Sequence, residues 1–271
     1  MDKVTKHNEK KWDQLVQKEV PCGRPRIDLD PKKAKEWLDK GNIFGDLTNK
    51  KVLCLASGGG QQSIGFALLG ADVTVVDFSR EQLKKDEEIA NKYKKTIRIV
   101  KSDMRDLSSF EDDEFDVVYQ PYSINYIPET EKVFDEVSRV LKKGGIYHLM
   151  FHNPFVQGSW KDGCWGSEWK RDDLWEGKGY LIWQPYKDGH PIMTSDPHWN
   201  FNDTQGNEVK VDSPQEFKHT LSTVMNGLIE RDFNLLRFEE YKGEEYDSTP
   251  GTWVHYVSVA PPWFFLWLRK G

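Results

Sequence analysis

A chain of 271 residues with a formal net charge of -6 is long enough for one large α/β domain or for a domain that carries a substantial insertion. Its acidic balance argues against a broad nucleic-acid-binding surface, and its longest apolar run, 263–268, is too short to cross a bilayer. The three cysteines, far apart in the sequence, predict neither a disulfide framework nor a zinc site, and the polar, lysine-rich N-terminus leads us to expect a cytoplasmic protein.

The first 49 residues are polar and contain two predicted helices. Trp12, Leu15 and Val16 share one face of the first helix. In the second, Asp30 is an N-cap residue and Pro31 occupies the first helical position, with Gly41 expected to end the helix.

From residue 50 onward, strands and helices alternate. An S-x-x-Q capping box at 79–82 marks the start of one long helix. The predicted strands are 51–55, 72–76, 97–100, 115–119 and 146–151, and the predicted helices are 61–69, 80–93 and 130–141. This alternation predicts a parallel sheet with helices on both faces, which is a doubly wound α/β fold.

The pattern changes over residues 152–212, which are rich in Gly, Trp, Asp and Pro and lack helical periodicity. A structureless loop of this length is improbable in a compact domain, so we predict an inserted cap with short strands around 179–183. Six of the 11 tryptophans fall here: Trp160, Trp165, Trp169, Trp175, Trp183 and Trp199. They could form an aromatic cage for an acceptor or a small core, and we favour the core for most of them.

The last segment is predicted to return to regular structure. Ser213-Pro214-Gln215-Glu216 combines an N-cap, a first-turn proline and a capping-box glutamate, which predicts a helix from 213 to about 230. Two strands are expected after it, near 234–241 and 252–260, and the short connection between them predicts an antiparallel hairpin. The aromatic run 263–267 is then expected to pack on the hairpin or at a dimer contact.

The most informative motif lies after the first strand, where Ser57 is followed by Gly58, Gly59 and Gly60 at the start of a helix. Glycines at such a turn allow a ligand to approach the backbone and leave helix N–H groups free to bind polar atoms. Asp77 ends the next strand, and a carboxylate in this position suits the hydroxyls of a ribose. The sequence therefore predicts a cofactor of the nucleoside type.

The order of these motifs resembles the class I S-adenosylmethionine (SAM)-dependent methyltransferases, over 50–150 and more loosely over 213–268. The resemblance implies a Rossmann-like, seven-stranded, mostly parallel sheet closed by an antiparallel hairpin. It implies SAM as cofactor and S-adenosylhomocysteine (SAH) as product. On this basis we expect a helical lid over 1–49, a SAM-binding core formed by 50–151 and 213–271, and a cap over 152–212.

The resemblance also assigns residues. The glycine loop matches the segment that wraps the methionine moiety, Asp77 the ribose ligand, and Asp103 with Met104 the pair that binds adenine. The implied cofactor-binding residues are Ala56, Ser57, Gly58, Gly59, Gly60, Gln62, Asp77, Phe78, Ser79, Asp103, Met104, Gln120 and Pro121. The chain departs from the family at Cys54, where an acid is common, and at Ala56, where glycine is common. Gln61, Gln62 or backbone carbonyls would have to replace the acid.

Methyl transfer from a sulfonium is a direct displacement, so catalysis rests mainly on alignment and exclusion of water. Candidates for a catalytic role are Tyr122, His152 and His219. Their structural alternatives are a strand-exit turn, a histidine packed under the cap and a solvated histidine in a first helical turn. His148 and His152 lie four apart on a strand and its exit, which is not the geometry of a helical metal site, and no metal is expected.

Several functions remain open at this stage. A nicotinamide-dependent oxidoreductase is disfavoured because Ser63 stands at the last glycine position of its G-x-G-x-x-G fingerprint. A SAM-binding protein without activity would not need the large cap. The cap and the acidic charge favour a small-molecule acceptor over a protein or a nucleic acid. We expect a monomer or a homodimer.

Overall fold

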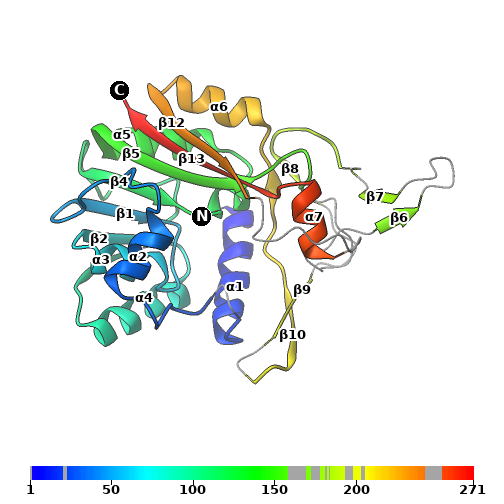
Figure 1. The fold of residues 1–271 in the computed structure, drawn as a ribbon, viewed down its shortest axis with the longest axis horizontal. Helices are drawn as coiled ribbons and strands as arrows, with labels where there is room; N and C mark the ends of the chain where they lie inside the picture. Colours follow the sequence, from blue (N-terminus) through cyan, green and yellow to red (C-terminus); the bar gives the residue numbers. More distant parts are fainter. Residues whose placement is uncertain are drawn as a thin grey trace.

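The computed structural model describes residues 2–20, 23–157, 184–192, 205–241 and 252–271, together with the shorter stretches 169–171, 178–180, 182 and 198–202. Within these ranges the chain forms one large sheet with helices on both faces and three small two-stranded sheets (Figure 1).

The large sheet has seven strands in the order β12-β13-β5-β4-β1-β2-β3. β13 runs antiparallel to both of its neighbours, and the pairs among β1 to β5 are parallel. The predicted Rossmann-like fold is therefore confirmed. Its strands are β1 (Lys51–Leu55), β2 (Asp72–Asp77), β3 (Ile97–Lys101), β4 (Phe115–Gln120), β5 (Leu141–His152), β12 (Phe233–Glu240) and β13 (Trp263–Lys270).

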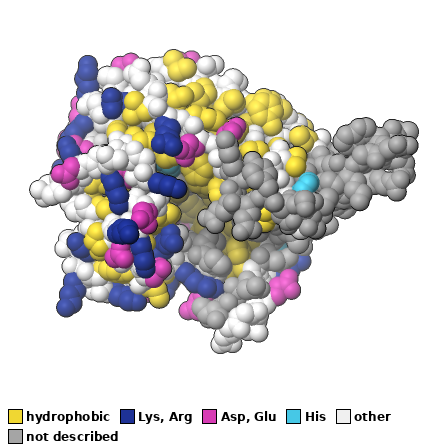
Figure 2. All heavy atoms as spheres, viewed as in Figure 1, with side chains coloured by type: hydrophobic (Ala, Val, Ile, Leu, Met, Phe, Trp, Pro, Cys, Tyr) yellow, Lys and Arg dark blue, Asp and Glu magenta, His cyan; other side chains and the backbone are white. Residues whose placement is uncertain are grey.

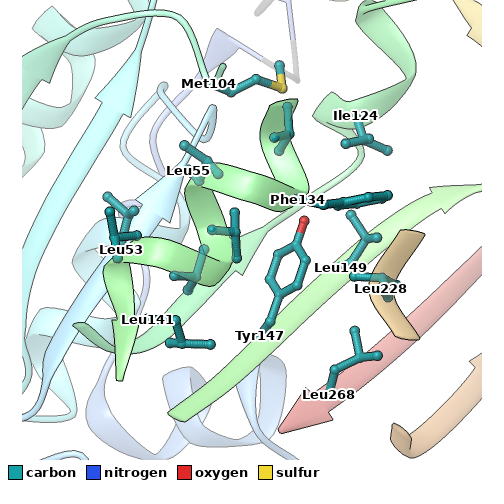
Figure 3. Packing of buried hydrophobic residues seen from close by; sticks show 14 of the residues in the cluster. Leu53, Leu55, Met104, Ile124, Phe134, Leu141, Tyr147, Leu149, Leu228 and Leu268 are labelled. Atoms are coloured by element: carbon teal, nitrogen blue, oxygen red, sulfur yellow. The ribbon is translucent and has the colours of Figure 1, made fainter. Parts of the chain in front are cut away.

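Alternation along the strands divides the core into two layers. Val52 and Cys54 of β1 pack under α2, α3 and α4, whereas Leu53 and Leu55 pack on the other face with α5 and α6. Figure 3 shows this second layer, where the Tyr147 ring of β5 stands among leucines and Phe134. The helices are α1 (Lys3–Gln17), α2 (Pro31–Leu38), α3 (Gln62–Leu68), α4 (Arg80–Tyr93), α5 (Glu131–Val140), α6 (Leu221–Ile229) and α7 (Trp253–Val259).

Several predicted caps are confirmed, and two helix ends differ from prediction. Asp30 and Ser79 cap α2 and α4 through their side chains. The second helix ends at Leu38 rather than near Gly41. α5 ends at Val140, and β5 begins at the next residue, because the chain turns directly into pairing with β4.

The prediction of the last strand was wrong. Residues near 252–260 form α7, whose N-cap Thr252 accepts a hydrogen bond from the His255 N–H at 3.2 Å. The closing strand is instead β13, the aromatic run that we expected to pack outside the hairpin. Alternate residues of β13, Phe264, Leu266 and Leu268, are buried, so this run fits between β12 and β5 with one face in the core.

The helix predicted from residue 213 was also wrong at its start. The helix begins at Leu221, after the N-cap Thr220, and residues 217–218 form strand β11. The side chain of Asn8 forms two hydrogen bonds with the backbone of Gln215. Its Oδ1 accepts from the Gln215 N–H at 2.7 Å, and its Nδ2 donates to the Gln215 carbonyl at 3.1 Å. Because a tertiary partner satisfies these groups, the local capping signal does not start a helix here.

The described part of 152–212 contains short strands, one of which overlaps the start of the predicted stretch 179–183. They are β6 (Trp169–Arg171), β7 (Lys178–Tyr180), β8 (His190–Pro191), β9 (His198–Asn202) and β10 (Glu208–Asp212), and β8 pairs with β11 (Phe217–Lys218). Trp199 packs against Trp12 and Phe201 with ring centroids 6.3 and 6.0 Å apart. This tryptophan therefore belongs to a small core, and the side chains of the other five lie outside the described residues.

The surface and the helices show two further features. In the coloured part of Figure 2, Lys and Arg side chains are interspersed with Asp and Glu, and they do not form a separate basic area on this face. Across the described ranges, no helix combines the length and the apolar character needed to cross a bilayer.

Candidate cofactor site and active site

A cavity lies at the carboxyl ends of β1, β2 and β4, the edge at which open α/β sheets bind ligands. Its walls come from the loops that follow these strands, from the loop after β3 and from α1. The lining residues are Trp12, Ala56, Ser57, Gly58, Gln61, Gln62, Asp77, Phe78, Gln82, Met104, Pro121, Tyr122, Ser123 and Tyr126. Eight of the thirteen predicted cofactor-binding residues and one predicted catalytic residue, Tyr122, are among them.

The glycine loop has little room for side chains. A Cβ atom on Gly58 would lie 2.6 Å from the Gln82 Cβ, and one on Gly60 would lie 2.7 Å from the Lys85 carbonyl oxygen. Gly60 also has a φ of 69°, which disfavours any other residue. Ala56 adopts a φ of 45°, so this position uses the left-handed conformation for which glycine is common in the family.

Asp77 shapes the loop from the end of β2. One carboxylate oxygen accepts from the Gly58 N–H at 3.0 Å, and the other accepts from the Ser79 N–H at 2.8 Å. Burial, together with the nearby carboxylate of Asp13, raises its pKa to about 6. The residue thus presents a desolvated carboxylate to the cavity, which suits hydroxyl donors and a cationic ligand.

A second buried acid, which was not predicted from the sequence, is Asp86 of α4. It accepts from the Gly59 N–H at 3.0 Å and from the Ser63 hydroxyl, and it interacts with the Gly60 N–H. Burial raises the pKa of the Cys54 thiol, and the nearby charge of Asp86 also contributes to this rise. Asp86 therefore supplies, from the neighbouring helix, the loop-orienting carboxylate that Cys54 does not provide.

Burial, together with the charge of Asp77, raises the pKa of Asp86 to about 7. The only sequence signal for this role was an aspartate on the predicted inner face of α4, in line with buried Leu83 and Ile89. That pattern does not distinguish a loop anchor from an ordinary polar position, so structure was needed to find it.

The remaining predicted cofactor residues lie behind the cavity wall. Ser79 caps α4 and donates to Asp13 at 2.6 Å, and Gly59 is held by Asp86. Asp103 forms an ion pair with Arg105 at 2.7 Å. Gln120 is fully buried, where it donates to Met104 Sδ at 3.3 Å. These residues, with Gly60, position the lining rather than form it in this conformation.

α1 covers the cavity and is held by polar contacts along its length. Asn8 donates to the Tyr126 carbonyl at 2.9 Å, Lys11 pairs with Asp212, and Asp13 binds Ser79. The Trp12 ring, which lines the cavity, meets the edge of Tyr126 with centroids 5.3 Å apart. By contrast, α2 packs against α3 in the sheet domain, and the described residue of the N-terminal segment that lines the cavity is Trp12 of α1.

The three predicted catalytic residues have different surroundings. Tyr122 lines the cavity, and its hydroxyl donates to Glu216 Oε2 at 2.7 Å. His152 lies behind it with ring centroids 6.0 Å apart, and burial lowers its pKa to about 4, so its imidazole is neutral at pH 7. His219 lies on the segment before α6 and is buried, with Nε2 3.1 Å from the Ile124 carbonyl oxygen and away from the cavity.

No group of three or more His, Cys, Asp or Glu side chains in the described part of the chain is arranged to hold a metal ion. The buried thiol there is Cys54, and Cys22 and Cys164 lie outside the described residues. The chemistry available at the cavity is therefore that of a glycine loop, two buried carboxylates, aromatic rings and Tyr122 with its partner Glu216.

Comparison with known proteins gives a consistent result. Residues 53–149 match a family model described as a methyltransferase domain. The uncharacterized methyltransferase YbaJ of Bacillus subtilis (strain 168) is 34% identical over 263 residues, which are 90% of this chain and 92% of that protein. A ubiquinone biosynthesis O-methyltransferase of Paraburkholderia phymatum is 30% identical over 122 residues, which are 45% of this chain and 51% of that protein.

The fold comparison agrees. The crystal structure of an S-adenosylmethionine-dependent methyltransferase from Mesorhizobium loti matches 89% of this chain and 100% of its own, with a TM-score of 0.63 and 17% identity. The full-length likeness to YbaJ, the matched methyltransferase domain and the glycine loop beside Asp77 all lead to one family. This chain belongs to the class I SAM-dependent methyltransferases, enzymes that take a methyl group from SAM.

Proposed function

We propose that this enzyme transfers the methyl group of SAM to a small-molecule acceptor, by direct displacement, with catalysis mainly by positioning. The observation that supports this acceptor class is that α1 covers the cavity. An ion pair between Lys11 and Asp212 holds α1 against β10. A covered cavity admits a small acceptor more readily than a folded protein or a nucleic acid.

The residues that would hold SAM follow from the lining. The backbone of Ser57 and Gly58 would bind the methionine part, Asp77 the ribose hydroxyls, and Phe78 with Met104 the adenine ring. When bound, SAM supplies an electrophilic methyl group on a sulfonium. Asp77 and Asp86, both buried beside the loop, provide negative charge that favours such a cation.

The rest of the reaction depends on alignment. Tyr122, Tyr126 and Trp12 form an aromatic wall beside the glycine loop, and this wall would orient an acceptor and keep water out. The relative of Paraburkholderia phymatum, named for O-methylation in ubiquinone biosynthesis, is consistent with a small organic acceptor.

The first experiment measures SAM and SAH affinity by calorimetry for the wild type, Asp77→Ala and Asp72→Ala. The two aspartates stand at opposite ends of β2, and Asp72 is exposed. We expect Asp77→Ala to weaken SAM binding by roughly 10- to 100-fold, since charge-assisted hydrogen bonds contribute about 1.5–3 kcal/mol each. Equal affinity of the two variants would refute the ribose assignment.

The second experiment concerns the acceptor. Radiolabelled SAM is incubated with the enzyme and either a panel of small hydroxyl, amine and thiol compounds or total protein and RNA. We expect SAH release with members of the small-molecule panel and no label in macromolecules. Label confined to protein or RNA would overturn the proposal.

A further inference from the structure

Glu216 contacts a lining residue of the cavity, and the proposed function gives it no role. It precedes β11, and its Oε2 accepts hydrogen bonds from the Tyr122 hydroxyl at 2.7 Å and from Gln157 Nε2 at 3.3 Å. Gln157 is itself held in place, because its Nε2 also donates to the Phe217 carbonyl at 3.2 Å. Tyr122 lines the cavity and Glu216 does not, so the tyrosine side chain stands between the cavity and the carboxyl group that its hydroxyl contacts.

Glu216 has no cation in direct contact with it among the described residues. Among the described residues, no Lys, Arg or His forms an ion pair with it, and its Oε1 accepts no hydrogen bond from them. Its side chain lies deep in the protein yet remains partly accessible, and burial raises its pKa above the ordinary glutamate value of 4.5. A buried carboxylate without a cation has an increased affinity for a proton.

The partner of Glu216 is suited to pass a proton on. Burial raises the pKa of Tyr122 far above its ordinary value, so this phenol remains protonated and cannot act as the base itself. Its single proton is directed at Glu216, so its oxygen keeps lone pairs that can accept a further hydrogen bond.

We propose that Tyr122 and Glu216 form a proton relay for an acceptor whose nucleophile is a hydroxyl group, such as a phenol or an enol. This rests on the proposed function. The acceptor O–H donates to Tyr122 Oη. As the new O–CH₃ bond forms and the S–CH₃ bond breaks, the acceptor proton moves to Oη and the proton of Tyr122 moves to Glu216 Oε2. The products are the methyl ether, SAH and neutral Glu216, which later releases its proton to solvent.

Other titratable groups surround the pair and define the pH experiment. They are Tyr126 of η2 (Ser123–Tyr126), His152 at the end of β5, Lys218 of β11 and Tyr256 of α7. His152 is neutral above pH 5, since its pKa is about 4. Asp77 and Asp86 beside the cavity also titrate, at about 6 and about 7, so we assign to Glu216 the part of the acid limb that Glu216→Gln removes, with activity rising as pH increases through a pKa above 4.5.

The test compares the wild type with Glu216→Gln, Tyr122→Phe, the double variant and Glu230→Gln, an exposed control at the end of α6. SAH release is measured with phenol, 4-nitrophenol, an alkylamine and a thiol. At pH 8, 4-nitrophenol is ionised and needs no relay, whereas phenol does. We expect the two single variants to lower kcat for phenol by about 100-fold, the double variant to lower it no further, and 4-nitrophenol turnover to change much less.

Two measurements do not depend on turnover. SAM affinity should be unchanged in Glu216→Gln, and its thermal stability should be no lower than that of the wild type, which excludes misfolding as the cause. NMR titration of carboxyl carbons in glutamate-labelled apoenzyme should show one glutamate, absent in Glu216→Gln, with a raised pKa. Tyr122→Phe should raise that pKa further, because the hydrogen bond from Tyr122 favours the ionised carboxylate.

The outcomes separate this relay from the proposed function. Failure of the wild type to bind SAM, or label found only in macromolecules, would overturn the proposed function. Turnover of phenol that is equal in the wild type and Glu216→Gln would overturn the relay alone. Turnover restricted to the thiol or the amine, or a Glu216 signal that Tyr122→Phe does not move, would overturn it too.

Discussion

Replacing Asp86 by asparagine should stabilise the folded apoenzyme at pH 8. Asparagine keeps nearly the same shape, so its Oδ1 can accept from the Gly59 N–H while its Nδ2 donates to the Ser63 hydroxyl. What the substitution removes is a negative charge that is fully buried and has no cationic partner within ion-pair distance among the described residues. The loop should keep its shape while the desolvation cost disappears.

The expected magnitude follows from the pKa. That of Asp86 is about 7 in the folded protein and 3.8 for an unperturbed aspartate. A tenfold change in proton affinity corresponds to about 1.4 kcal/mol, so ionising Asp86 costs the folded state about 4 kcal/mol. Because the folded pKa is raised, the folded state binds the proton more tightly, and this cost grows as pH rises from 3.8 and is complete above about 7.

Urea unfolding followed by tryptophan fluorescence at pH 5, 6.5 and 8 measures this difference. We expect Asp86→Asn to be more stable than the wild type by up to about 4 kcal/mol at pH 8 and by less than about 2 kcal/mol at pH 5. His148 and His152, whose pKa values are lowered by burial, produce the opposite pH dependence. They are present in both proteins, so their effect cancels in the difference.

The control is Asp72→Asn, the same change at an exposed aspartate, for which no pH-dependent gain is expected. A second comparison uses Asp86→Ala, which loses both hydrogen bonds to the loop. We expect this variant to bind SAM about tenfold more weakly, and Asp86→Asn to bind it more tightly than the alanine variant does. If Asp86→Asn were less stable than the wild type at pH 8, the reasoning about a desolvated loop anchor would be refuted.

Two further predictions concern the loop and α1. Gly60→Ala should weaken SAM binding strongly, whereas Gly45→Ala should not. The two glycines have similar φ values of 69° and 67°, so the backbone strain of the substitution is similar. They differ in crowding, because a Cβ on Gly60 meets the Lys85 carbonyl oxygen at 2.7 Å and one on Gly45 meets nothing within 4 Å. Calorimetry on both variants checks this, and equal effects would show that backbone strain rather than crowding matters. Deleting residues 2–20 removes Trp12 from the cavity wall and also removes Asp13, the hydrogen-bond partner of Ser79. SAM affinity should therefore fall by about tenfold or more. Unchanged affinity would contradict a lid role for α1.

The parts of the fold that were predictable depend on short-range patterns. The strands at 51–55 and 115–119, the glycine turn and the helix capped by Ser79 all appear where they were expected. In each case hydrophobic alternation, a cap or a glycine specifies the structure within about ten residues of chain, and the parallel sheet buries these strands as the pattern requires.

The errors occurred where a distant partner overrode a local signal. The Ser213–Glu216 tetrapeptide has a good capping sequence, but Asn8 binds its backbone and Tyr122 binds Glu216. Residues 252–260 have the composition of a strand, but the neighbour of β5 is the aromatic run of β13, which buries one face more completely. Propensity is a weak guide when two candidate segments compete for one place in a sheet.

The sequence by itself determined the family, the cofactor class and most of the loop at the carboxyl edge of the sheet, because Ser57–Gly60, Asp77 and Met104 lie at or just after the carboxyl ends of their strands. Only the tertiary structure identified Asp86 and Glu216, which reach the cavity region from α4 and from the segment before β11. Their roles depend on burial and on partners 27 and 94 residues away in the chain, and no local pattern encodes such distances.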